Sequence, residues 1–139
     1  MRIVLDTNIF VSGLLGKSGP PGKLLRLWTD GAFMLITSAY QLDELRRVVN
    51  YSRLRHRITP EQTAALLDNL QIKASILEKL PAVDFSPDPD DNPILATAIA
   101  GAADIIVSGD KSHMVALEQV EGIPIITPRE ALARLEPPP

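Results

Sequence analysis

The sequence contains no cysteine. This absence excludes disulfide bridges, thiolate metal sites and cysteine nucleophiles, and it favours a reducing compartment. No apolar run in the sequence approaches the ~18 residues that a membrane-spanning helix requires. The first residues, Met1 to Asp6, become charged too early for a signal peptide. We therefore expect a cytoplasmic protein.

An excess of positive charge is also missing. Lys and Arg number 14 against 17 Asp and Glu, which gives a net charge of −3 and argues against a basic nucleic-acid coat protein. A nuclease is still compatible with this balance, because metal ions reverse the local sign of an acidic site. With 139 residues, of which 45% are apolar, the chain can bury one core. We expect a single domain over residues 1–136 and a disordered tail at 137–139.

Short apolar runs alternate along the chain with segments of helical periodicity. Strands are expected at 2–5, 33–37, 75–80, 105–107 and 123–126, and helices at 8–15, 23–29, 38–49, 59–73, 92–100, 114–119 and from 127 onward. Segment 16–22 is a loop by composition, either a flap or a plain connection. The alternation predicts an α/β fold with three layers, α/β/α, and a mainly parallel central sheet.

Acidic residues come directly after several of the expected strands. Ligands of such folds gather at the carboxyl ends of the strands, and the acids placed to meet there are Asp6, Glu44, Asp91 and Asp110. Each one alone is better explained as a helix cap, a partner of a helix dipole or a turn residue. Together they would repel one another unless a cation joined them, and oxygen ligands suit Mg²⁺ or Mn²⁺. Such ions bind phosphate oxygens and activate water, so the set predicts metal-assisted phosphodiester chemistry.

Segments 3–8, 38–45, 91–98 and 106–110 resemble, in order and spacing, the PIN-domain family. Within that family they look like VapC-like ribonuclease toxin components of toxin–antitoxin systems. This resemblance implies a PIN-like fold and an endoribonuclease that hydrolyses RNA phosphodiester bonds with Mg²⁺ or Mn²⁺. It also implies a homodimer and a cognate antitoxin protein. The metal ligands that it implies are Asp6, Glu44, Asp91 and Asp110, with Asn8 and Ser108 supporting them from outside the metal shell.

The position of the third acid is open to a shift by one residue, because Asp90 adjoins Asp91. The spacing to Leu95 and Ala96 matches the family pattern when Asp91 is the ligand. We therefore choose Asp91.

Arginines are dense just beyond Glu44, at Arg46, Arg47, Arg53, Arg55 and Arg57. They could form a phosphate-binding rim for RNA or a solvated helix face. If the helix continues through this stretch, three of them share one side and would contact RNA, namely Arg46, Arg53 and Arg57. The segment 50–52 could break that helix. His56 and His113 have no partner pattern for a metal site, and we interpret both as surface residues.

Other functions of α/β domains fit the sequence less well. A haloacid-dehalogenase-like phosphatase requires a second Asp two residues after Asp6, where this chain has Asn8. A phospho-acceptor signalling domain requires an acidic pair at the first strand and an acceptor Asp at a central strand, and the expected strands offer neither. The remaining alternative to the ribonuclease is a catalytically inactive PIN-fold binding module that uses its acids for a basic partner.

Overall fold

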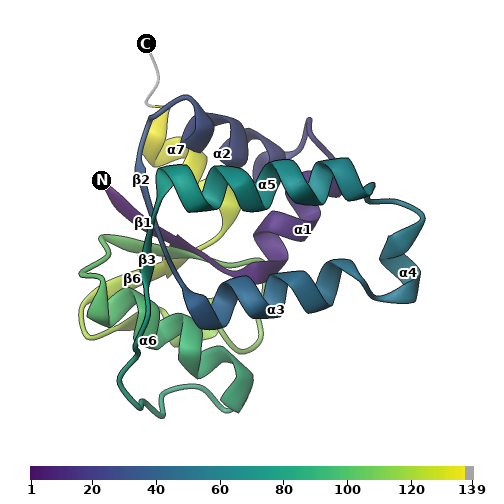
Figure 1. The fold of residues 1–139 in the computed structure, drawn as a ribbon. Coiled ribbons are helices and arrows are strands. Elements are labelled where there is room, and N and C mark those ends of the chain that lie inside the picture. The colour runs from purple at the N-terminus through teal and green to yellow at the C-terminus, as the bar shows by residue number, and fades with distance from the viewer. Residues whose placement is uncertain (137–139) are drawn as a thin grey trace.

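A computed structural model describes residues 1–136, except the side chain of Ser52. One six-stranded sheet has the order β3-β2-β1-β4-β6-β5. The parallel strands are β1 (Arg2–Leu5), β2 (Met34–Ser38), β3 (Ala74–Leu77), β4 (Ile105–Val107) and β6 (Ile123–Ile126). The short strand β5 (Gln119–Val120) runs antiparallel to β6. The predicted α/β fold with a mainly parallel sheet is confirmed (Figure 1).

Alternating side chains of β1 divide the core into two layers. Ile3 and Leu5 face one layer, whereas Val4 faces the other. The first layer is covered by α1 (Thr7–Leu15), α2 (Pro20–Thr29), α3 (Ala39–Val49), α5 (Pro60–Lys73) and α7 (Pro128–Leu135). The second is covered by α6 (Asn92–Ala100), whose alanines let it approach the sheet closely. Three short elements complete the fold, α4 (Ser52–Arg55) and the 3₁₀ turns η1 (Pro89–Asp91) and η2 (Val115–Leu117).

The direction in which the chain adds strands reverses at β1. This strand pairs in parallel with β2 on one side and with β4 on the other. At such a point the connections leave the sheet in opposite directions, and a crevice opens beyond the carboxyl ends of the two central strands. Asp6 directly follows β1 and Asp110 follows β4, so the topology brings both to this crevice.

The capping signals of the sequence place the helix starts. Thr59 accepts a hydrogen bond from the N–H of Gln62, whose side chain bonds back to the N–H of Thr59, so α5 begins with a complete capping box. Ser38 accepts from the N–H of Gln41 at the start of α3. Thr127 accepts from the N–H of Glu130 at the start of α7.

Helix α2 starts earlier than predicted, at Pro20 instead of Lys23. The first helical turn has no use for the N–H groups that prolines lack, so Pro20 and Pro21 fit there. The preceding connection packs closely, because a Cβ atom on Gly22 would lie 2.5 Å from the carbonyl oxygen of Lys17. This close packing favours a plain connection over a flap.

The predicted helix at 114–119 is wrong. Only the 3₁₀ turn η2 forms there, because Glu118 adopts a left-handed backbone with φ of 65° and reverses the chain. Gly122, with φ of 82°, then completes the turn that lets β5 pair with β6. The third strand also ends earlier than expected, at Leu77.

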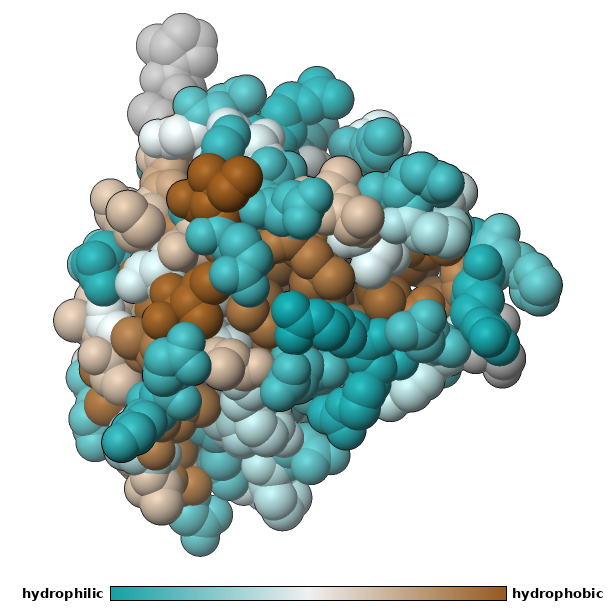
Figure 2. Space-filling model, viewed as in Figure 1, coloured by the Kyte–Doolittle hydropathy of each residue, from teal (hydrophilic) through white to brown (hydrophobic). Residues whose placement is uncertain are grey.

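Hydrophobic side chains gather on the face shown in Figure 2 over β3 and between α5 and α3. No helix in the described part of the chain is long and apolar enough to cross a membrane. The predicted tail, residues 137–139, lies outside the described residues.

Candidate active site

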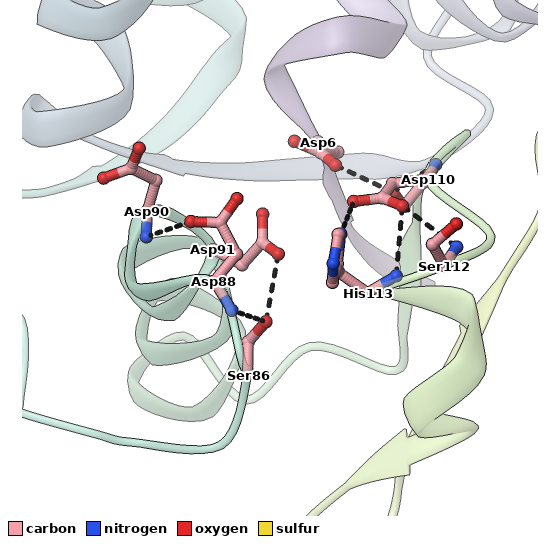
Figure 3. Close-up of polar contacts among 9 residues, drawn as sticks. Asp6, Ser86, Asp88, Asp90, Asp91, Asp110, Ser112 and His113 are labelled. Carbon is pink, nitrogen blue, oxygen red and sulfur yellow. Dashed lines mark hydrogen bonds and ion pairs between the residues drawn. The ribbon is translucent and has the colours of Figure 1, made fainter.

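Asp6 lies at the carboxyl end of β1 and is 8% exposed. The hydroxyl of Ser108, which is fully buried, donates to Oδ2 of Asp6 at 2.7 Å. The same Ser108 oxygen accepts from the N–H of Asp110 at 3.0 Å. Ser108 therefore connects the acids that follow β1 and β4, Asp6 and Asp110, both of which are labelled in Figure 3.

The pKa of Asp6 reflects this setting. The pKa is raised from 3.8 to about 6, and burial is the largest cause. The negative charges of Asp91 and Glu44 contribute to the increase, whereas the hydrogen bond from Ser108 lowers the pKa. Asp6 thus shares one electrostatic neighbourhood with acids from two other elements.

Asp91 precedes α6 and is held by a serine of the preceding loop. The buried Ser86 hydroxyl donates to Oδ2 of Asp91 at 3.0 Å. Burial raises the pKa of Asp91, the Ser86 hydrogen bond lowers it, and the charges of Asp88 and Asp110 raise it. In Figure 3 the carboxylate of Asp91 is turned toward Asp110, whereas the exposed Asp90 points away. The geometry therefore favours Asp91 over Asp90 as the third acid.

Glu44 is fixed by residues at the end of β1. The Thr7 hydroxyl donates to Oε1 of Glu44. One turn earlier in α3, the buried Gln41 donates from Nε2 to the carbonyl oxygen of Leu5 at 2.6 Å and accepts at Oε1 from the hydroxyl of Thr37, also at 2.6 Å. These bonds attach α3 to the carboxyl ends of β1 and β2, and they bring Glu44 to the crevice.

Asp110 interacts with the residues that follow it. Its Oδ1 accepts from the N–H groups of Ser112 at 3.0 Å and His113 at 3.1 Å. Nδ1 of His113 lies 3.5 Å from Oδ2 of Asp110 (Figure 3). The His113 side chain is 49% exposed, which agrees with its interpretation as a surface residue. That interpretation missed its contact with Asp110. The signal in the sequence is its position three residues after Asp110.

The supporting residues differ in part from those predicted. The hydrogen bonds that hold the acids come from Thr7, Ser86 and Ser108. Asn8 is exposed on the first turn of α1, next to Thr7, and its supporting role stays a prediction. Sequence reasoning missed Thr7, although it directly follows Asp6, and it missed Ser86, for which the sequence offers no signal.

The helix does not continue through the arginine segment, so the condition under which Arg46, Arg53 and Arg57 would share one side is not met. Asn50 donates from Nδ2 to the carbonyl oxygen of Arg46 at 2.8 Å, and α3 ends at Val49. Arg53 lies in the separate helix α4, and Arg57 follows that helix. Figure 2 shows hydrophilic side chains over the outer face of α3 and around α4, which fits solvated residues. RNA contact through Arg46, Arg53 or Arg57 stays a prediction.

The donor set has the chemistry of a site for hard divalent ions. Asp6, Glu44, Asp91 and Asp110 offer only oxygen atoms, which Mg²⁺ and Mn²⁺ prefer. Burial and mutual repulsion raise the pKa of Asp6, and a bound cation would relieve that repulsion. Among residues 1–136, no three acidic or histidine side chains form a group tight enough to hold an ion in their present positions. The ligand types therefore fit a divalent ion, although the carboxylates are not gathered into one tight group in the described structure.

Comparisons with known proteins agree with this architecture. The profile of the PIN domain matches residues 2–112. The protein MJ1680 of Methanocaldococcus jannaschii is 30% identical over 113 residues, which cover 80% of this chain and 72% of that protein. In the crystal structure of VapBC2 from Rickettsia felis bound to a DNA fragment from their promoter, one chain has a similar fold, with a TM-score of 0.60 and 18% identity. That match covers 91% of this chain and 98% of the other. The chain therefore belongs to the PIN-domain family.

Proposed function

We propose that this chain is a metal-dependent endoribonuclease and the toxin component of a toxin–antitoxin pair. One observation carries the proposal: the buried Asp6 is joined through Ser108 to Asp110 and lies in the field of Asp91 and Glu44. A buried carboxylate repelled by its neighbours lowers stability, and such groups are concentrated at functional sites. Asp6 also lies where the strand order of the parallel sheet reverses, and α/β folds bind ligands at such points.

Asp6, Asp91 and Asp110 would hold Mg²⁺ or Mn²⁺, and Glu44 would bind it directly or through water. A bound ion supplies contacts to phosphate oxygens and activates water for attack on phosphorus. The chain's own contribution is orientation, since Ser108 fixes Asp6 and Ser86 fixes Asp91. Each hydroxyl group bonds one carboxylate oxygen, Oδ2, of its acid.

The proposed partners derive from the family and from the fold comparison. RNA is the substrate, and the exposed arginines beyond Glu44 would neutralise its phosphates. The Rickettsia felis structure is named as VapBC2 bound to promoter DNA. Its similar fold supports, for this chain, a small cognate antitoxin. A homodimer, a cytoplasmic location and a single domain over residues 1–136 complete the proposal.

A cleavage assay tests the nuclease. Labelled single-stranded RNA is incubated with the purified chain in Mn²⁺, Mg²⁺ or EDTA, beside the Asp91→Asn and Asp90→Asn variants. We expect metal-dependent cleavage that Asp91→Asn abolishes and Asp90→Asn retains, because only Asp91 faces the other acids. Cleavage that persists in both variants would come from a contaminating ribonuclease, and absence of cleavage by the wild-type chain would contradict the proposal.

A PIN-fold binding module is the second candidate. The observation that favours it is the lack, within residues 1–136, of three acidic or histidine side chains already close enough for an ion. Titration calorimetry with Mn²⁺ separates the two functions. Metal binding that Asp6→Asn weakens supports the nuclease, whereas no binding together with no cleavage supports the module.

A further inference from the structure

A pocket of about 390 Å³ opens next to the acidic crevice. Its walls come from the start of α3, the loop after β3 and the start of α6, and they include Tyr40, Pro81, Val83, Pro89, Asn92 and Pro93. Figure 1 shows these segments below the carboxyl end of β2, where α3 and α6 approach each other. The lining residues include none of the four acids, so the pocket is a feature separate from the carboxylates themselves.

Its position is tied to two of the proposed metal ligands. Tyr40 lies one helical turn before Glu44, and residues four apart project from the same face of a helix. On the opposite wall, Pro89 and Asn92 flank Asp91 in the chain. A molecule in this pocket would therefore lie beside the site at which the acids act.

The lining chemistry indicates the kind of molecule. None of the lining residues carries a charge, so the pocket is not built for a phosphate group. Tyr40 is 42% exposed and lines the pocket together with prolines, which suits a flat heterocycle. Oδ1 of Asn92 already accepts from the N–H groups of Phe85 and Ser86, each at 3.0 Å. Only its Nδ2 remains, and it can donate to the polar edge of such a ring.

We propose that this pocket binds one nucleobase of the single-stranded RNA, stacked on Tyr40, next to the phosphate that is cleaved. The inference rests on the proposed ribonuclease function and adds a base-binding subsite to it. A bound base would place the adjoining phosphate at the carboxylates, since the pocket lies between the segments that carry Glu44 and Asp91. Tyr40 is therefore a substrate-binding residue, and Asn92 contributes to which base is preferred.

Fluorescence of 2-aminopurine tests the stacking without cleavage. Short single-stranded oligoribonucleotides carry the probe at each position in turn and are titrated in Mn²⁺ with the Asp110→Asn chain, which is expected not to cleave. We expect quenching at one position that Tyr40→Ala abolishes and Tyr40→Phe retains. Ile72→Ala is the control, because Ile72 is 79% exposed and lies before the amino end of β3, away from the acids. Equal quenching with and without Tyr40→Ala, or none at any position, would overturn the inference.

Kinetics of the active chain give the second readout. Tyr40→Ala should raise KM for RNA by about tenfold, within the range for loss of one aromatic–base stack, while kcat stays within about twofold. An unchanged KM would contradict the subsite even if cleavage is metal-dependent. Conversely, Tyr40-dependent quenching in a chain that never cleaves RNA would retain the subsite and refute the nuclease.

Discussion

Replacing Asp6 by asparagine should stabilise the metal-free chain at neutral pH. Asn has nearly the same shape as Asp and can still accept the hydrogen bond from Ser108 at its Oδ1, but it carries no charge. In the folded chain the pKa of Asp6 is about 6, against an ordinary value of 3.8. The folded state therefore holds this proton more tightly than the unfolded state. The resulting contribution to stability is fully present below the lower pKa and is lost as the pH rises through the higher one.

The difference between the two pKa values, about two pH units, corresponds to about 3 kcal/mol at 1.36 kcal/mol per unit. Above about pH 7 the wild-type chain bears this full cost of keeping Asp6 ionised, whereas Asp6→Asn does not. Below about pH 3 the Asp6 carboxyl is protonated in both the folded and the unfolded state, and the two proteins should be about equally stable. The stability gained by the substitution should therefore grow as the pH rises from about 3 to about 7 and remain at its full value above that.

Urea unfolding in EDTA, followed by the fluorescence of the buried Trp28, measures this difference across the pH range. Asp68→Asn, at an exposed position on α5, is the matched control and should change stability by less than about 0.5 kcal/mol. A variant that is no more stable than the wild type at neutral pH, or a gain that does not depend on pH, would refute the reasoning. Added Mn²⁺ should stabilise the wild type more than Asp6→Asn, because only binding to the folded state raises its stability.

Three further outcomes depend on particular contacts. Thr7→Val removes the hydroxyl that holds Glu44, and calorimetry should show Mn²⁺ affinity reduced about 10–100-fold; unchanged affinity would place Glu44 outside the metal shell. Gly22→Ala places a Cβ atom 2.5 Å from a backbone carbonyl and should cost about 1–3 kcal/mol in urea unfolding, whereas Gly109→Ala, with no atom within 4 Å, should be near neutral. Arg57→Ala should reduce the salt dependence of RNA binding by about one unit of slope, and an identical slope would remove Arg57 from the RNA path.

The strands and the acids could be predicted because their signals are local. Each central strand is a short β-branched run, and in a parallel sheet the residues after each strand lie at one edge. Sequence position alone therefore places Asp6 and Asp110 at that edge, where the structure has them. The side chains that hold the acids, in contrast, reach them only through the tertiary fold. Ser86 reaches Asp91 only because the loop before α6 folds back on itself, and no periodicity in the sequence encodes that return.

Local conformation accounts for the helix that was predicted wrongly and for the break in the arginine segment. A helical pattern over 114–119 gives way to a hairpin because Glu118 takes a positive φ, which a residue of this type rarely adopts. The arginine segment fails as one helix because the Asn50 side chain bonds to the carbonyl of Arg46 at the end of α3. In both places one residue's backbone or side chain outweighs the hydrophobic pattern of its neighbours.

Strand β1 precedes both of its neighbours, β2 and β4, along the chain, and this order has a consequence during translation. The hydrogen bond between Ser108 and Asp6 joins residues 102 positions apart, and β4 must emerge from the ribosome before it can pair with β1. A nascent chain that ends before Ile105 has neither Ser108 nor Asp110, and one side of β1 is left without its neighbour strand. The four acids therefore lie together only after β4 and the residues that follow it have been synthesised.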